Sequence, residues 1–238
     1  MRKPCHVTNT QMLPLHTWVD KLSDLEWVAK SPPVDPDFLL TETVARQIGA
    51  YSDLIVPLTH DLEKSVAYKK CGMGPESLVR MEWGMRMVHE IARWGYPFGS
   101  VAAAEPARRL EKAVWDFGYG LPACRVQNYW SDDVVVRGPA GLRWLALISE
   151  TDRRIMLVLQ SYDAKPRDAR LVFDVRRLGF APRGTITDVE TGEGLGQAGA
   201  TVAIPMNRPY ATRVIVCAAG PFSGRVAIER ASSSNLPR

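Results

Sequence analysis

Long apolar segments and closely spaced cysteines are both missing from this sequence. No apolar run reaches 18 residues, so no membrane-spanning helix and no membrane partner are expected. The start, residues 1–6, is basic but lacks the apolar stretch of a signal peptide. The four cysteines are too far apart in sequence for a metal clip or redox pair, and we expect mostly buried free thiols, with a single disulfide left open as the alternative. They are Cys5, Cys71, Cys124 and Cys217.

Three motifs that would identify an enzyme class directly are also absent. His89-Glu90 does not belong to a His-Glu-x-x-His zinc site, because position 93 is arginine. No Gly-x-Ser-x-Gly elbow of an esterase occurs. The glycine-rich segment 192–196 does not open a helix, so we interpret it as a hairpin turn and not as a phosphate-binding loop. We therefore predict no metal and no cofactor, and we interpret His89 as a packing residue more readily than as a ligand.

The composition is that of a soluble globular protein. Of the 238 residues, 46% are hydrophobic and 24% are charged, which is sufficient for a sizeable core. The net charge is +4, and the excess of basic residues is small and scattered along the second half. A scattered excess is typical of a solvated surface, so we expect no nucleic acid among the partners.

Residues 1–125 have the pattern of alternating helices and buried strands. A helix is expected over 35–48, after a proline-rich segment and before Gly49. The apolar run 53–58 is typical of a buried parallel strand. Further helices are predicted over 76–95 and 104–116, with the second starting near Glu105-Pro106. This order of elements favours an α/β arrangement.

Residues 126–230 are rich in strand signals. Short alternating or apolar segments are separated by turn residues, which predicts an antiparallel β-sandwich. The expected strands are 126–130, 133–138, 142–149, 153–161, 169–176, 184–190, 200–205, 211–218 and 225–229. The serine-rich tail, 231–238, is expected to be disordered.

One group of candidate binding residues lies near the N-terminus, where aromatic and acidic side chains are dense. Proteins that bind sugars use aromatic faces for stacking and carboxylates for hydroxyl groups or proton transfer. Asp24 and Glu26 would share one face of a strand but diverge on a helix. Catalysis, sugar contact and plain loop structure all stay open for these carboxylates. The candidates for substrate contact are His16, Trp18, Asp20 and Glu26.

A second candidate pair, His60 and Asp61, follows the predicted strand 53–58. Ligands of parallel α/β folds lie at the carboxyl ends of the strands, which favours a binding role for both residues. A helix cap with a hydrogen-bonded imidazole is the alternative.

Taken together, these segments resemble glycoside hydrolase family 123-like proteins, which are large bacterial proteins with a glycosidase-like barrel. The resemblance rests on spaced motifs in both halves of the chain. They are the run from His6 to Trp18, Asp20, Asp24-Leu-Glu26-Trp27, Asp37-Phe38 with Glu42 and Gln47, Met87-Val-His89-Glu90-Ile91, Asp188-Val-Glu-Thr-Gly192-Glu193 and Pro209-Tyr-Ala-Thr-Arg213-Val-Ile-Val.

The resemblance implies the C-terminal part of a (β/α)8-type barrel over 1–125, followed by the sandwich over 126–230. A complete barrel takes roughly 250 residues, so the chain is expected to be the C-terminal portion of a longer protein or of a truncated reading frame. Similar glycosidases carry an adjacent Asp-Glu pair in the barrel, and no Asp-Glu dipeptide occurs here. The catalytic residues are therefore unknown.

We expect a glycoside hydrolase-like protein that acts on a polysaccharide or an amino-sugar glycoside and is inactive on its own. Carbohydrate and the missing N-terminal portion are the expected partners, and the family implies a secreted or periplasmic location. The alternative is a non-catalytic carbohydrate-binding or structural sandwich with a helical docking segment. A hydrolase complete in itself would need its acid and base among Asp20, Asp24, Glu26 and Asp61.

Overall fold

The structure is a computed structural model of the whole chain. It describes the backbone and side chains of residues 73–90, 104–131, 136–199 and 201–218. It also describes the backbone of four short strands before residue 94 and of residues 101–103. The helix expected over 35–48, the strand expected over 225–229 and the tail 231–238 lie outside the described residues.

Four parallel strands form a small sheet in the first half of the chain. They are β1 (Cys5–His6), β2 (Lys21–Asp24), β3 (Tyr51–Leu54) and β4 (Ala92–Arg93). Neighbours in the sheet are neighbours in the sequence, in the order β1-β2-β3-β4. The parallel strand predicted over 53–58 is thus present, but it begins two residues earlier. Parallel strands joined by long connections are the expected α/β pattern, whereas their closure into a barrel stays a prediction.

Two long helices follow β3 and β4. Helix α5 (Pro75–Val88) ends seven residues before the predicted limit, because His89 caps it and Glu90 turns into the left-handed region with a φ of 53°. Helix α6 (Val101–Phe117) begins three residues before the predicted start and contains Pro106 in its second turn. Gly118, with a φ of 119°, follows its last residue, as expected for a helix end that requires positive φ.

The second half is the predicted antiparallel sandwich. A six-stranded sheet has the order β11-β10-β13-β8-β7-β5, and a three-stranded sheet has the order β12-β9-β6. The strands are β5 (Cys124–Asn128), β6 (Val136–Arg137), β7 (Leu142–Ser149), β8 (Arg154–Ser161), β9 (Arg167–Phe173), β10 (Thr185–Asp188), β11 (Gly194–Gln197), β12 (Thr201–Met206) and β13 (Thr212–Ala218).

Two local features differ from the prediction. The strand predicted over 169–176 ends at Phe173, because the Asp174 side chain accepts hydrogen bonds from the backbone N–H groups of Arg176 and Arg177 and caps the short helix α7 (Val175–Leu178). The interpretation of residues 192–196 as a hairpin turn is correct only in part. It contains a turn after β10, but from Gly194 onwards it is a strand, β11, paired with β10.

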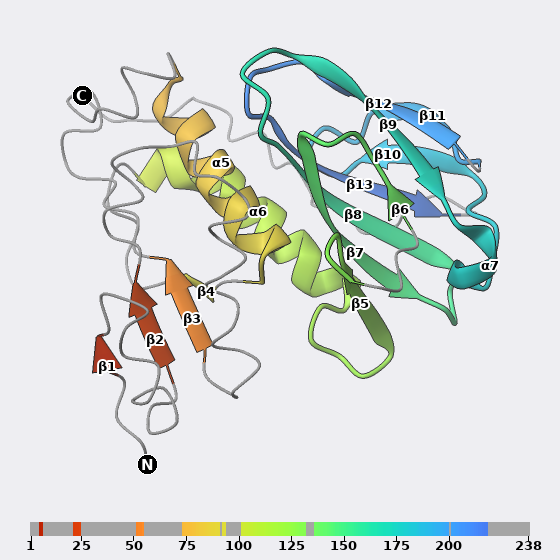
Figure 1. The fold of residues 1–238 in the computed structure, drawn as a ribbon, viewed down its shortest axis with the longest axis horizontal. Helices are drawn as coiled ribbons and strands as arrows, with labels where there is room; N and C mark the ends of the chain where they lie inside the picture. The colour runs from red at the N-terminus through yellow and green to blue at the C-terminus, as the bar shows by residue number, and fades with distance from the viewer. Residues whose placement is uncertain are drawn as a thin grey trace, which may run out of the picture.

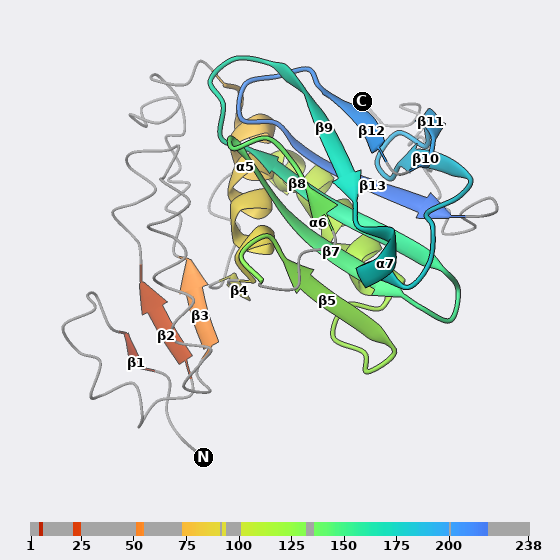
Figure 2. The ribbon, with the colours of Figure 1, turned by 45° about the vertical axis from the view of Figure 1, so that its right-hand side comes forward.

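The central strands of the six-stranded sheet are buried on both faces. Trp144, Ala146 and Ile148 of β7 pack against the three-stranded sheet, whereas Leu145 and Leu147 pack against α5 and α6. Figures 1 and 2 show the resulting layers, with the helices on one side of β7 and β8 and the three-stranded sheet on the other. Because neither face of the sheet is exposed to solvent at β7, the sequence of this strand is nearly all apolar and does not alternate between apolar and polar residues.

In this arrangement, elements before and after residue 125 contribute to one hydrophobic core. Side chains of α5 and α6 and the helix-facing side chains of β7, β8 and β13 belong to one buried cluster. The helices of the first half and the sheet of the second half therefore share a core. The division into 1–125 and 126–230 stays a prediction about where the two parts could separate.

Candidate functional site

The carboxyl ends of the parallel strands are the first candidate for a site. The four strands run in the same direction, so their carboxyl ends lie at one edge of the sheet. Asp24 is the last residue of β2, and its backbone pairs in register with Leu54, the last residue of β3. In parallel α/β folds this edge is where loops bring ligand-binding side chains together.

The six predicted substrate-contact residues lie outside the described residues. They are His16, Trp18, Asp20, Glu26, His60 and Asp61. In the sequence, Asp20 immediately precedes β2, whereas Glu26 follows its end by two residues. His60 and Asp61 follow the last described residue of β3 by six and seven positions. Glu26, His60 and Asp61 therefore follow the end of a described strand most closely, whereas His16 and Trp18 follow β1 by ten and twelve positions. The role of all six residues stays a prediction.

Helix α5 begins on the side towards which the strands of the parallel sheet run. The strand arrows of β2 and β3 point towards the end of the molecule where α5 begins, as Figure 1 shows. The loop between β12 and β13 reaches this same end in Figures 1 and 2.

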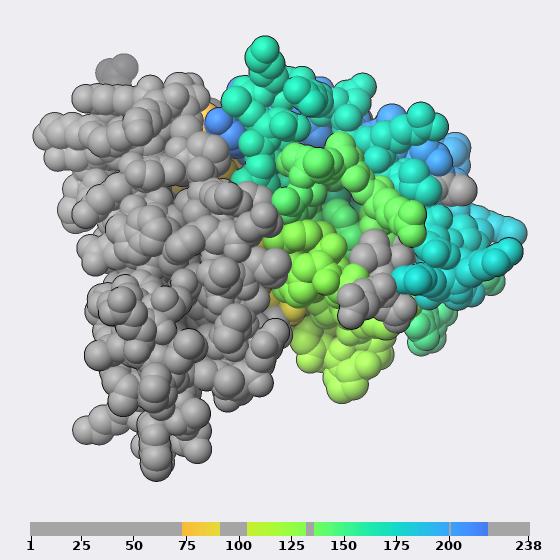
Figure 3. Space-filling view, viewed as in Figure 1, coloured from red at the N-terminus to blue at the C-terminus, as the bar shows by residue number. Residues whose placement is uncertain are grey.

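Between these elements the structure has a polar groove of about 520 Å³. The groove is bordered by the start of α5, the turn after β10 and the loop between β12 and β13. In Figure 3, orange atoms of the start of α5 lie against blue atoms of the second half in this region. The polar lining includes Ser77, Arg80, Asp188, Glu190, Asn207, Arg208, Tyr210 and Arg213.

Two ion pairs hold the walls of the groove. Arg80 of α5 donates to Oε1 of Glu190, and Arg213 Nε of β13 donates to Oδ2 of Asp188 at 2.7 Å. Oδ1 of Asp188 accepts from the backbone N–H groups of Glu190 (2.9 Å) and Thr191 (3.0 Å), which fixes the turn. Burial raises the pKa of Glu190 above its usual value, and the nearby Arg80 guanidinium partly offsets this effect.

A buried hydrogen-bond network fixes the helix against the sheet below the groove. The Thr212 hydroxyl lies 2.6 Å from Gln160 Oε1 and 2.9 Å from the backbone oxygen of Arg80. Gln160 Nε2 donates to the backbone oxygens of Ser161 and Tyr210. The Tyr210 bond holds the residue at one end of the groove, where Tyr210 has a positive φ of 51°. A positive φ is strained for a residue other than glycine, and it persists only where the surrounding contacts fix the backbone.

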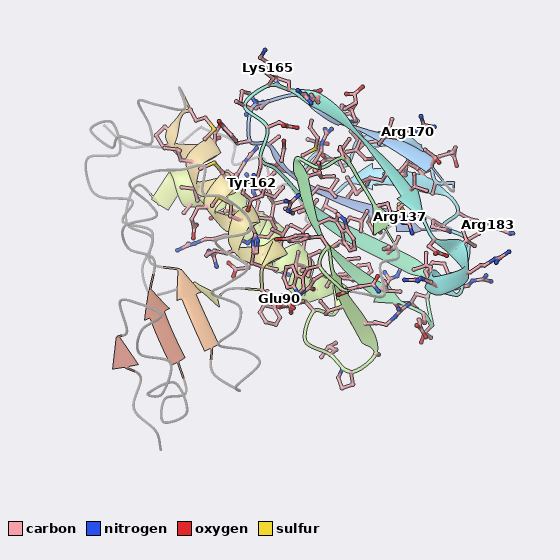
Figure 4. All side chains as sticks on the ribbon, in the orientation of Figure 1. Glu90, Arg137, Tyr162, Lys165, Arg170 and Arg183 are labelled. Atoms are coloured by element: carbon pink, nitrogen blue, oxygen red, sulfur yellow. The ribbon has the colours of Figure 1, made fainter. Side chains whose placement is uncertain are left out.

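His89 and Glu90 form a second polar cluster at the opposite end of α5. His89 Nδ1 donates to the Met85 backbone oxygen (2.7 Å), so Nε2 accepts from the Tyr129 hydroxyl (2.8 Å). Glu90 Oε2 accepts from Asn128 Nδ2 at 2.7 Å. This end precedes β4 by two residues, and Figure 4 shows Glu90 at the far end of the helix. The cluster therefore packs α5 against β5, in agreement with the interpretation of His89 as a packing residue.

The cysteines and acidic groups of the described residues do not form a metal site. No group of three or more histidine, cysteine, aspartate or glutamate side chains with metal-site geometry occurs in the described part of the chain. Cys124 and Cys217 carry free thiols, and burial raises the pKa of Cys217 to about 12. The side chains of Cys5 and Cys71 lie outside the described residues. Among the described helices, none is long and apolar enough to cross a membrane.

Comparison with known proteins shows what kind of fold this is. No protein-family model matches the chain, and no curated protein matches it. Among solved structures, a variant of a GH27 β-L-arabinopyranosidase from Geobacillus stearothermophilus, in complex with arabinose, is similar with a TM-score of 0.56 at 10% identity. The match covers 89% of this chain and 48% of that chain.

Two other glycosidases match at a similar level. For α-galactosidase I from Mortierella vinacea, the TM-score is 0.52 at 8% identity, and the match covers 87% of this chain and 55% of that chain. For the maltogenic α-amylase AmyB from Thermotoga neapolitana, the TM-score is 0.51 at 10% identity, and the match covers 90% of this chain and 54% of that chain. The chain thus spans about half the length of these structures. The fold is glycosidase-like, and its sandwich corresponds to that of GH27-like enzymes.

The groove residues were missed by the sequence analysis. Asp188, Glu190 and Arg213 belong to segments that carry the family resemblance, yet none received a role. A signal was available in the turn residues 191–194 and 207–209, because surface loops of a rigid scaffold often carry binding residues. Their approach to Arg80 was not predictable, because more than 100 residues separate them in the sequence.

Proposed function

We propose that this chain is the closing part of a glycosidase-like (β/α) barrel together with its C-terminal β-sandwich, and that it binds carbohydrate. The observation that carries this proposal is the order β1-β2-β3-β4 of parallel strands, followed by an antiparallel sandwich packed on α5 and α6. This arrangement matches about half of several glycoside hydrolase structures. The finer assignment to glycoside hydrolase family 123-like proteins rests on the sequence motifs.

A closed barrel of this kind takes eight strands, and the described residues contribute four. We propose that a complementary polypeptide supplies the others and the catalytic Asp-Glu pair. The substrate would be a polysaccharide or an amino-sugar glycoside. Glu26, His60 and Asp61, which follow strand ends, would contact sugar hydroxyl groups, with His16, Trp18 and Asp20 as further contacts.

The proposal is tested by sugar binding and hydrolysis with the full chain. We expect saturation-transfer NMR signals from N-acetylgalactosamine or galactose that weaken in Asp61→Ala and Trp18→Ala. We expect no hydrolysis of aryl glycosides. If both variants bind as well as the wild type, the assignment of these residues is wrong. Hydrolysis by the wild type that disappears in Glu26→Gln would instead identify a self-sufficient enzyme.

The alternative of a non-catalytic carbohydrate-binding or structural module makes a different prediction. Addition of the polypeptide that carries the remaining barrel strands would then produce no hydrolysis that depends on Glu26, His60 or Asp61. Sugar binding by the sandwich would be unaffected by these substitutions.

A further inference from the structure

The polar groove between α5 and the sandwich lacks a role in the proposal above, because none of its lining residues is among the six proposed sugar contacts. Its volume of about 520 Å³ lies within the range of small-molecule sites, about 300–1,000 Å³. The walls come from α5, β10, β13 and two turns, and the ion pairs and hydrogen bonds described above fix their positions. A groove built on such elements is preformed.

Several polar groups of the groove have no hydrogen-bond partner among the described residues. Oε1 of Glu190 accepts from Arg80, whereas Oε2 takes part in no hydrogen bond with the described residues. The same holds for the Ser77 hydroxyl and the Asn207 side-chain amide in the described part of the chain. Acceptors and donors are therefore both available, as a ligand with several hydroxyl groups requires.

The charges of the groove favour a neutral ligand. Arg80 is paired with Glu190, and Arg213 is paired with Asp188. Among the lining residues, Arg208, which is exposed, is the one charged side chain without an ion-pair partner in the described part of the chain. A strongly anionic or cationic ligand would have to compete with these ion pairs, whereas a neutral hydroxyl-bearing ligand would not.

We propose that this groove is a second carbohydrate-binding site, which takes one neutral pyranose unit of a glycan. The inference rests on the proposed function for the class of ligand, because the groove chemistry fits hydroxyl groups and the fold is glycosidase-like. Glu190 accepts from sugar hydroxyls, Asn207 and Ser77 donate and accept, and Tyr210 borders the site with an aromatic ring.

The test measures the binding of D-galactose, L-arabinose and maltose to the full chain by saturation-transfer NMR. Asn207→Ala removes a side chain without a hydrogen bond in the described structure, so it should leave folding intact. Combined with Glu190→Gln, it should weaken the binding of at least one sugar about tenfold or more. Glu193→Gln is the matched control, because Glu193 lies in the same turn but does not line the groove.

Several results would overturn the proposal. These are no binding of any of the three sugars by the wild type, unchanged binding by Asn207→Ala combined with Glu190→Gln, or an equal loss in Glu193→Gln. Binding of glucuronate alone would assign the groove to an acid through Arg208. A thermal unfolding curve of each variant shows that it is folded.

The same measurement separates this site from the proposed one. If the groove binds, the signal lost on changing Glu190 and Asn207 persists in Glu26→Gln combined with Asp61→Ala. A signal lost only in Glu26→Gln combined with Asp61→Ala supports the proposed function and overturns sugar binding in the groove. A signal lost only in Glu190→Gln combined with Asn207→Ala supports sugar binding in the groove and contradicts the contacts proposed for Glu26 and Asp61.

Discussion

Gly84 lies at the point where α5 comes closest to the sheet. A Cβ atom at this position would lie 2.2 Å from Gln160 Oε1 and 2.6 Å from Thr212 Cγ2. Neither neighbour can move freely, because both belong to the hydrogen-bond network beneath the groove. The absence of a side chain at residue 84 is thus what allows the helix to reach the network.

We expect Gly84→Ala to lower the free energy of unfolding by about 1–2 kcal/mol. Overpacking costs up to about 3 kcal/mol, and the better helix propensity of alanine returns about 1 kcal/mol. Urea unfolding measures the change. Gly199→Ala is the control, because the nearest atom to its added Cβ would be 3.9 Å away, and it should change stability by less than about 0.5 kcal/mol. Equal effects of both substitutions would contradict the close approach.

Glu190 should make the stability depend on pH. Burial raises its pKa above the usual 4.5, with Arg80 acting in the opposite direction. The folded state therefore holds the proton more tightly than the unfolded state, so the stability from this group is present below pH 4.5 and is lost as the pH rises through the raised pKa. Relative to Glu190→Gln, the wild type should lose stability between pH 4 and 7 in urea unfolding. A wild type that gains stability over this range would show that the Arg80 ion pair dominates.

Helix α5 shows which parts of an element the sequence could predict. Its apolar positions predicted a helix, but not its end at Val88, which depends on the His89 contact with Tyr129, 40 residues later. Strands β7 and β8 were predicted within one residue, because apolar runs flanked by turns are a strong local signal. β11 was missed, since Gly194 and Gly196 obscure its pattern and its pairing with β10 forms it.

The sandwich was predicted correctly because its strands carry local apolar and turn signals. The groove was not predicted, because it depends on contacts between segments that are distant in the sequence. The Arg80–Glu190 ion pair joins residues that are 110 positions apart. Neither the hydrophobic periodicity nor the turn residues of a single sequence indicate which distant residues form such an ion pair. The candidate residues in the first 61 positions stay predictions, because they lie outside the described residues.

Within α5, Glu82 and Arg86 form a buried ion pair one turn apart, and Arg86 Nη2 has no hydrogen-bond partner. Glu82→Leu alone should lower the free energy of unfolding by about 3–5 kcal/mol, because it leaves a buried charge without its partner. The double variant Glu82→Leu with Arg86→Met should restore most of this loss. Urea unfolding of the wild type, of Glu82→Leu and Arg86→Met alone, and of the double variant gives the coupling. Additive losses would mean that the two charges do not depend on each other.

For the whole molecule, the shared core predicts how the second half behaves alone. Six helix-facing side chains of the sheet are buried, and burial contributes about 1.5–3 kcal/mol for each of them. They are Leu145, Leu147, Met156, Val158, Val214 and Val216. Together these contributions are comparable to the entire stability of a typical domain, about 5–15 kcal/mol.

We therefore expect the polypeptide of residues 126–238 to unfold at a lower temperature than the full chain and to bind a dye specific for exposed apolar surface. Thermal unfolding and dye fluorescence of the two proteins, each at the same concentration, measure this. A monomeric second half with the melting temperature of the full chain would show that residue 125 separates two independent folding units.

The six-stranded sheet, which is covered on both faces, also constrains how segments of this fold can be exchanged between related proteins. A chimaera joined near residue 125 would pair one parent's helices with the other parent's sheet, and their interlocking side chains would not match. A crossover before residue 73, ahead of α5, would keep both partners of the contact from the same parent. In this protein the transplantable unit is thus the sandwich together with its two helices.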